Sequence, residues 1–196
     1  MSITFIDGTT PLDAVHMNAL AQKPSYGTSL PASPTDGQEA ILVDSVTNPT
    51  YQWRFRYNAG SSSAYKWEFV GGTPVAVATS GTATWATSWG NIAGGPSFTL
   101  PRAGDWLLQA SAIASNTAAD TQSFVGADDS TAPSNIAPIA SSFIQVATAA
   151  RWGTGYATGR ANGLAAGVQV AFRVAVSGGT STYDFRRLVV QPVRVA

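Results

Sequence analysis

The sequence predicts a mainly β protein: a short N-terminal helix, then a small β module, then an antiparallel β-sandwich of jelly-roll type. From residue 39 onward, many segments alternate apolar and polar residues with the period of two that half-buried strands show. Nineteen Gly and 11 Pro residues in 196 separate these segments at short intervals, as in all-β domains. The stretch 9–20 instead repeats its apolar residues at helical spacing.

That stretch, TTPLDAVHMNAL, has the signals of a helix N-terminus. Thr10 suits the capping position, and Pro11 suits the first helical position because its missing N–H would have no partner there. An apolar stripe follows, formed by Leu12, Val15, Ala19 and Leu20. A helix of about a dozen residues is marginal by itself in water, so we expect this stripe to dock on another surface.

His16, the single histidine, lies within this stretch. The chain has no cysteine and no second histidine that could complete a metal site with it, and it lacks the G-x-S-x-G motif of a nucleophile elbow. We therefore interpret His16 as a helix-surface or interface residue. We expect no catalytic residue, no metal and no cofactor.

Composition narrows the function classes further. Charged residues make up 11% of the chain and the formal net charge is zero, which argues against a nucleic-acid-binding face. No basic segment followed by an apolar run predicts a secretory signal, and no apolar run is long enough to span a membrane. Low charge with many small residues is typical of a surface covered by neighbouring subunits.

Four segments follow from the pattern. Residues 1–23 hold the helix, 24–38 form a linker rich in Pro, Gly, Ser and Thr, 39–72 form the small β module, and 73–196 form the sandwich. In the module, YQWRFRY and YKWEFV predict a hairpin whose opposed pairs are Tyr57 with Tyr65, Trp53 with Phe69, and Arg54 with Glu68. A module of this size without disulfides needs a partner surface.

The sandwich segment contains eight candidate strands, at 75–79, 83–87, 96–100, 105–114, 121–127, 141–149, 166–176 and 182–195. The clearest pattern is VQVAFRVAV, residues 168–176, which predicts a strand buried on one face. Arg173 lies on its less apolar face, so we expect it to meet a carboxylate or a carbonyl near a subunit boundary. The Ala-rich strand around residue 110 would allow close subunit approach.

Three further features are candidates for function. Asp128 and Asp129 could bind Ca²⁺ or stabilise a turn, and the turn fits better because few oxygen ligands are spaced for the cation. The glycine-rich stretch 153–163 lacks the Lys-Ser/Thr of a phosphate loop, so we expect a flexible surface loop. Three tryptophans in polar surroundings are candidates for ligand or intersubunit contact: Trp85, Trp89 and Trp152.

Residues 3–74 resemble a class of bacteriophage virion structural proteins. FIDGTTPLDAVHMNALAQ is similar to the N-terminal segment of tail-fibre, collar and minor tail proteins, and LPASPTDGQEAILVDS with WRFRY and WEFVGG is similar to a module of phage virion proteins. FTLPRAGDWLL and RRLVVQPVRV resemble, in general outline, their trimeric jelly-roll heads. The resemblance implies a non-enzymatic virion protein.

Under this resemblance, the protein is a homotrimeric fibre-like or spike-like appendage on the virion surface, made in the host cytoplasm. Its N-terminal helix would attach it to tail, collar or capsid proteins through Leu12, Val15, His16 and Leu20. The remainder would project outward and contact a host surface glycan or protein, without nucleic acid binding or membrane insertion. Two alternatives stay open: a capsid decoration protein that stabilises the head shell, and a carbohydrate-binding module or glycan-active enzyme.

Overall fold

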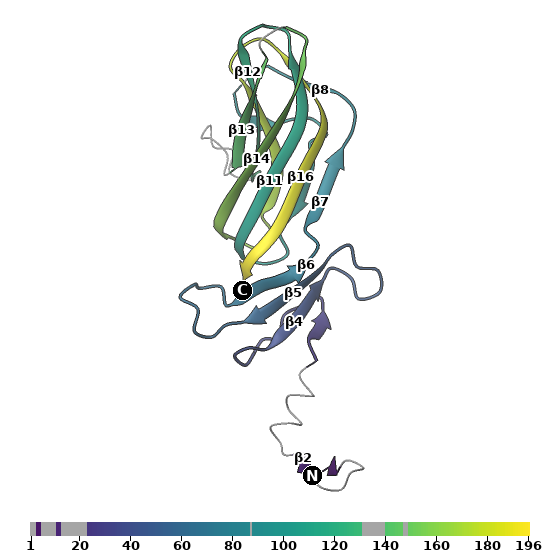
Figure 1. Cartoon of the computed structure of the whole chain (residues 1–196), viewed down its shortest axis with the longest axis vertical. Coiled ribbons are helices and arrows are strands. Elements are labelled where there is room, and N and C mark those ends of the chain that lie inside the picture. Colours follow the sequence, from purple (N-terminus) through teal and green to yellow (C-terminus); the bar gives the residue numbers. More distant parts are fainter. Residues whose placement is uncertain (1–2, 5–10, 13–22, 87, 131–139, 147–148) are drawn as a thin grey trace. The chain divides into compact units, whose positions relative to one another are not determined.

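The computed structural model describes residues 3–4, 11–12, 23–86, 88–130, 140–146 and 149–196. Figure 1 shows the chain as strands joined by loops and turns; the described residues include no helix. They form two compact units: residues up to 62 together with 67–72, and residues 63–66 together with 73–196. The mainly β fold class that the sequence predicts is confirmed.

The start of the predicted helix is wrong. Strand β1 (Ile3–Thr4) pairs antiparallel with β2 (Pro11–Leu12), so Pro11 is extended instead of occupying a first helical turn. The fixed φ of proline suits an edge strand as well as a helix N-terminus, and a short helix has little intrinsic stability to oppose the pairing. Val15, His16 and Leu20 lie outside the described residues.

The first unit contains a four-stranded sheet in the order β6–β5–β4–β3. Its strands are β3 (Ser25–Gly27), β4 (Glu39–Val43), β5 (Gln52–Tyr57) and β6 (Trp67–Gly72). β3 lies within the predicted linker and pairs parallel to β4, so part of that segment belongs to the sheet. The alternation of β5 is confirmed: Trp53 and Phe55 are fully buried, and Gln52, Arg54 and Arg56 are exposed.

The predicted hairpin register is wrong by two residues. Tyr57 pairs with Trp67, Phe55 with Phe69, and Arg56 with Glu68, and an irregularity between Arg54 and Phe55 then shifts the pairing. Aromatic residues therefore still face each other, but in different pairs from those expected: the ring centroids of Tyr57 and Trp67 are 5.3 Å apart. Arg54 forms its ion pair with Glu39 of β4 instead of Glu68.

The second unit is an antiparallel jelly-roll sandwich (Figure 1). In one sheet β16 lies between β11 and the short strands β7 and β8, and β11 also pairs with β14. In the other, β15 lies between β12 and the short strands β9 and β10, and β12 also pairs with β13. If each pair of short strands counts as one interrupted strand, the chain runs through the two sheets in the jelly-roll order.

The strands of this unit are β7 (Val75–Thr79), β8 (Ala83–Trp85), β9 (Gly90–Asn91), β10 (Ser97–Thr99), β11 (Gly104–Asn116), β12 (Thr121–Asp129), β13 (Ala140–Val146), β14 (Trp152–Leu164), β15 (Gln169–Val176) and β16 (Ser181–Val195). Each of the eight predicted strands overlaps one of these. The loop predicted at 153–163 is wrong, because those residues form most of β14.

Small residues on the inner face of β14 allow the two sheets to lie close together. A Cβ atom added to Gly155 would lie 2.7 Å from Cγ1 of Ile144 and 2.9 Å from Cγ2 of Val125, both on the opposite sheet. A Cβ added to Gly153 would lie 2.4 Å from Cγ2 of Ile144. These glycines leave the space that the branched side chains fill, at the density expected of a protein core.

The alanines of β11 contribute to the same interior. Ala110, Ala112 and Ala114 are at most 3% exposed and alternate with half-exposed residues on the other face. The expectation that they provide a surface for close subunit approach is therefore wrong. Their small size instead fits the narrow space between the sheets.

A hydrogen-bonded polar group closes one end of the sandwich core. The side chain of Asn116 donates to Ser181 Oγ at 2.9 Å, and Ser181 Oγ lies 2.6 Å from Ser123 Oγ. The hydroxyl of Tyr183 donates to the carbonyl oxygen of Ala175 at 2.8 Å, and burial raises the pKa of that hydroxyl far above its ordinary value. Tyr183 therefore stays neutral, as a buried tyrosine needs to be.

We predict that Gly155→Ala destabilises the sandwich by about 1–3 kcal/mol, because the added methyl group overpacks the contact with Ile144. Urea unfolding of the full chain measures the loss. A second change, Ile144→Val, should restore part of it by removing a methyl group from the same contact. Thr154→Ala, on the exposed face of the same strand, is the control and should change stability by less than about 0.5 kcal/mol. Equal effects of the two β14 variants would contradict this account.

Candidate functional site

The three candidate tryptophans lie in different surroundings. Trp85 on β8 covers Gly90, and its indole Nε1 donates to the carbonyl oxygen of Ser88 at 2.9 Å. The ring of Trp89 lies 5.7 Å from that of Phe124. Trp152, at the start of β14, is 51% exposed. The structure does not bring the three into one site, and Trp152 has the most open indole.

Trp152 belongs to the outer face of the sheet formed by β14, β11, β16 and β7. Because β14 alternates strictly, Tyr156 lies on the same face as Trp152, about 13 Å further along the strand, and is 54% exposed. Tyr156 pairs with Ser111, Ser111 with Arg187, and Arg187 with Ala78. Residues paired in this way share a face, so one row of side chains crosses the whole sheet.

A bulge in β16 determines which of its side chains reach this face. The pairing with β11 shifts between Ser111 and Ile113, and Phe185 has a positive φ of 47° there. Tyr183 and Leu188 are fully buried, whereas Phe185 is 65% exposed and Arg187 is also exposed. The bulge therefore shifts the alternation of inward and outward side chains along β16 by one residue, so that Phe185 and Arg187 point outward.

The same bulge directs Arg186 inward. Arg186 is 3% exposed, and its guanidinium donates to the carbonyl oxygens of Ala93 and Gly81, each at 2.9 Å. These carbonyls belong to the two turns that follow β7 and β9. Arg186 thus links both turns to β16 and fixes the backbone beside Phe185.

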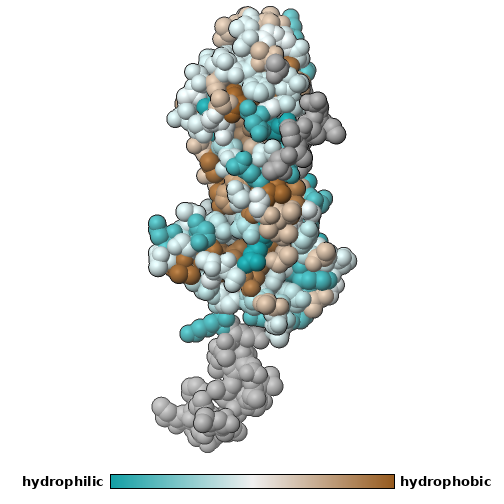
Figure 2. Space-filling model, turned by 180° about the vertical axis from the view of Figure 1, so that it is seen from behind, coloured by the Kyte–Doolittle hydropathy of each residue, from teal (hydrophilic) through white to brown (hydrophobic). Residues whose placement is uncertain are grey.

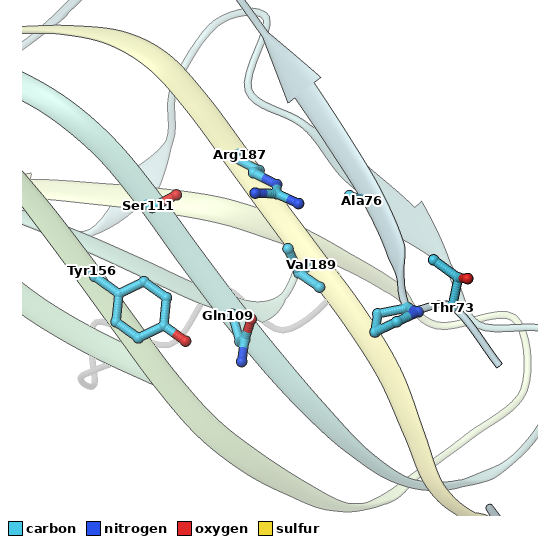
Figure 3. A pocket seen from close by; sticks show the side chains of 8 residues that line it. Thr73, Ala76, Gln109, Ser111, Tyr156, Arg187 and Val189 are labelled. Carbon is cyan, nitrogen blue, oxygen red and sulfur yellow. The ribbon is translucent and has the colours of Figure 1, made fainter. Parts of the chain in front are cut away.

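A shallow pocket occupies the middle of this outer face. Its volume is about 310 Å³, and its wall includes side chains from β14, β11, β16 and β7 (Figure 3). Figure 3 shows the ring of Tyr156 beside the amide of Gln109, with Arg187 above Val189 on the neighbouring strand. We define the outer-face site as Tyr156, Gln109, Ser111, Arg187 and Val189.

The outer face of the other sheet carries a buried ion pair. Arg173 Nη1 lies 3.1 Å from Asp128 Oδ2, and Nη2 donates to the carbonyl oxygen of Trp89 at 3.3 Å. The expected carboxylate and carbonyl partners of Arg173 are confirmed; the subunit boundary stays a prediction. β15 is buried on both faces rather than one, with Arg173 only 1% exposed, because the segment at Trp89 covers it.

This ion pair also corrects the interpretation of Asp128 and Asp129. Both residues lie at the end of strand β12, not in a turn. One carboxylate oxygen of Asp128 accepts from Arg173, and the other accepts the backbone N–H of Asp129 at 2.9 Å. In the described part of the chain, no three His, Cys, Asp or Glu residues gather as a metal site would need.

A second, polar hollow lies in the first unit. Its volume is about 220 Å³, and its wall includes Asp36, Arg56 and Glu68. Asp36 accepts the backbone N–H of Ala59 at 2.9 Å, and Glu68 accepts from the amide of Asn58 at 3.1 Å. Both carboxylates therefore stabilise the loop that joins β5 to β6.

Most of the surface seen in Figure 2 is weakly polar. Small and polar residues cover the sandwich unit on this side, with hydrophobic residues scattered among them. This agrees with a chain in which only 11% of residues are charged. In the described ranges, no helix has the length and apolar character needed to cross a membrane.

Comparison with known proteins adds little to this geometry. No family model matches the chain, and no curated protein matches its sequence. A carbohydrate-binding module of Cellvibrio mixtus lichenase 5A, solved with cellotriose, is 13% identical with a TM-score of 0.32, over 79% of this chain and 98% of that one. The CBM22-1 xylan-binding domain of Paenibacillus barcinonensis Xyn10C is 12% identical with a TM-score of 0.26, over 83% and 91%. At these scores neither likeness carries an argument about function.

Sequence reasoning missed Tyr156, Gln109, Phe185 and Arg187. A signal for Tyr156 was present, because WGTGYATGRANG alternates small residues with large or polar ones over its whole length. That period of two predicts a strand with a closely packed inner face. The signal for Phe185 and Arg187 was weaker, since a bulge reverses the alternation between Tyr183 and Arg187.

We predict that Asp128→Ala destabilises the protein by about 3–5 kcal/mol, because it leaves the buried guanidinium of Arg173 without its carboxylate. Chemical denaturation of the full chain measures the change. Glu39→Ala is the matched control: it breaks the exposed pair with Arg54 and should cost at most about 1 kcal/mol. A loss below 1 kcal/mol for Asp128→Ala would show that the pair contributes little to the fold.

Proposed function

We propose that this chain is a non-enzymatic structural protein of a bacteriophage virion, working as a homotrimeric fibre-like or spike-like appendage. The N-terminal segment attaches it to the particle, and the sandwich contacts the host surface. The motifs of residues 3–74 support the virion assignment. The contact role rests on one observation, which is the band of exposed aromatic residues on the outer face of the β14–β11–β16–β7 sheet.

Three large aromatic side chains of this sheet are about half exposed or more: Trp152, Tyr156 and Phe185. Aromatic residues are enriched where proteins contact partners, because they bury a large area with few rotatable bonds. Phe185 occupies a left-handed backbone conformation that an ordinary side chain adopts at a cost of about 1–2 kcal/mol. A large side chain at a strained, exposed position adds little to the stability of the fold, so its presence favours a role in contacting a partner.

The proposal of a trimer rests on the small size of the first unit and on the low proportion of charged residues. The described residues of the first unit form one four-stranded sheet and the short β1–β2 pair, and the chain has no cysteine for a disulfide, so a partner surface would stabilise the unit. Sedimentation of the full chain tests this part of the proposal, with a particle of three 20.3 kDa chains as the expected result. A single-chain mass at micromolar concentration would overturn it.

We predict that deletion of residues 1–23 abolishes incorporation into particles and leaves both β units folded and trimeric. If fully buried on a partner, each of Leu12, Val15 and Leu20 contributes about 1.5–3 kcal/mol. The double change Leu12→Asp with Leu20→Asp should have the same effect as the deletion. The measurement is the amount of the protein in purified particles, with circular dichroism and sedimentation as checks of the fold.

Two outcomes would change the proposal. If the truncated chain aggregates or loses its trimer, residues 1–23 belong to the fold. If it still enters particles normally, attachment runs through the β units, as in a capsid decoration protein that clamps the shell.

We predict that Phe185→Gly leaves the stability of the protein unchanged or raises it by up to about 1 kcal/mol, because glycine accepts the positive φ without strain. The same change should slow adsorption of particles to host cells about tenfold, as expected for loss of an aromatic contact residue. Val46→Gly, at an exposed residue of the other unit, is the control for adsorption. Normal adsorption of the Phe185→Gly particles would remove Phe185 from the contact surface.

A further inference from the structure

The outer-face site combines groups of different chemistry within two rows of side chains. Tyr156, Ser111 and Arg187 are paired across β14, β11 and β16, and Gln109 with Val189 form the next row. Two strand spacings separate Tyr156 from Arg187, which is about 10 Å. The pocket volume of about 310 Å³ is at the lower end of the range for small-molecule sites.

Each side chain offers a distinct contact. The ring of Tyr156 presents an open aromatic face that suits the C–H side of a sugar ring. The amide of Gln109 and the hydroxyl of Ser111 both donate and accept hydrogen bonds, as recognition of sugar hydroxyls requires. Val189 adds an apolar floor beside them.

Arg187 gives the outer-face site its charge. It is the one charged residue in the pocket wall, and it forms no ion pair with any residue that the structure describes. Two other arginines of the sandwich unit differ from it: Arg160 pairs with Asp105 at 2.9 Å, and the buried Arg173 pairs with Asp128. An exposed guanidinium beside neutral hydrogen-bonding groups favours an anion, above all a carboxylate that it can bind through two N–H groups.

We propose that the outer-face site binds a carboxylate-bearing sugar, a uronic acid residue of an acidic polysaccharide. Tyr156 stacks on the sugar ring, Gln109 and Ser111 bind its hydroxyls, and Arg187 binds its carboxylate. This rests on the proposed function, since it names the host-surface chemistry that the sandwich contacts. Trp152 lies on the same strand, about 13 Å from Tyr156, where it can contact another sugar residue of the same polysaccharide.

The test uses the full chain and two probes with the same three sugar rings. Trigalacturonic acid carries the carboxylates, and its methyl ester has the same rings without the charge. Titration calorimetry should show binding of the acid at about millimolar concentration and binding of the ester about tenfold weaker, because a charge-assisted hydrogen bond is replaced by a neutral one. Raising the salt concentration should narrow this difference.

Variants assign the binding to the site. Arg187→Gln should remove the preference for the acid over the ester, whereas Arg187→Lys, which keeps the positive charge, should retain part of that preference. Tyr156→Ala should weaken both probes about tenfold, whereas Tyr156→Phe keeps the ring and should bind as the native protein does. Tyr26→Ala and Arg56→Gln are the matched controls, since both residues are exposed in the first unit. Thermal unfolding confirms that each variant is folded.

Equal binding of acid and ester, or binding that survives both Tyr156→Ala and Arg187→Gln, would overturn the proposal. Equal affinity for inorganic phosphate would show a general anion site and would overturn it as well. A change of sedimentation in Tyr156→Ala would identify the face as a subunit interface instead. If the protein does not bind the acid, this proposal is wrong, and the virion role is still tested separately by incorporation into particles. If the protein binds the acid but is absent from particles, the sugar site stands and the virion role is wrong.

Discussion

The narrow separation of the two sheets is the constraint on which the sandwich depends. Ile144 and Val125 approach β14 so closely that its inner positions there accept only glycine. Because strand side chains alternate, this restriction leaves every second residue of β14 free to be large. Trp152 and Tyr156 occupy those outward positions. The closely packed inner face and the aromatic outer face therefore belong to the same strand.

The sequence alone predicted the strands correctly where the alternation between apolar and polar residues was clear. It predicted the fold class, the alternation of β5, and a strand at each of the eight places expected in the sandwich. It failed at β14 because glycine and alanine have low strand propensity, so a strand with a small inner face resembles a loop. It failed in the first unit because the irregularity at Arg54 shifts a register that composition alone cannot define.

The candidate site was harder to predict, since it depends on pairing between strands that are distant in sequence. Trp152 could be selected as a tryptophan in polar surroundings, but Arg187 becomes a neighbour of Tyr156 only through Ser111 on the strand between them. Arg173 and Arg187 are not distinguished by the sequence alone, since each is followed by apolar residues of a predicted strand. The fold separates them: the guanidinium of Arg173 is buried against Asp128, whereas that of Arg187 faces outward and has no carboxylate partner among the described residues.

The bulge at Phe185 connects stability to recognition. Arg186 enters the interior there and binds two turns, so the bulge is fixed from inside by hydrogen bonds to Ala93 and Gly81. That network requires the backbone shape but not the side chain of Phe185, which is 65% exposed. Glycine would allow the same shape with less strain. The fold therefore explains why a bulge exists at this point, and the proposed contact with a partner would account for the phenyl ring.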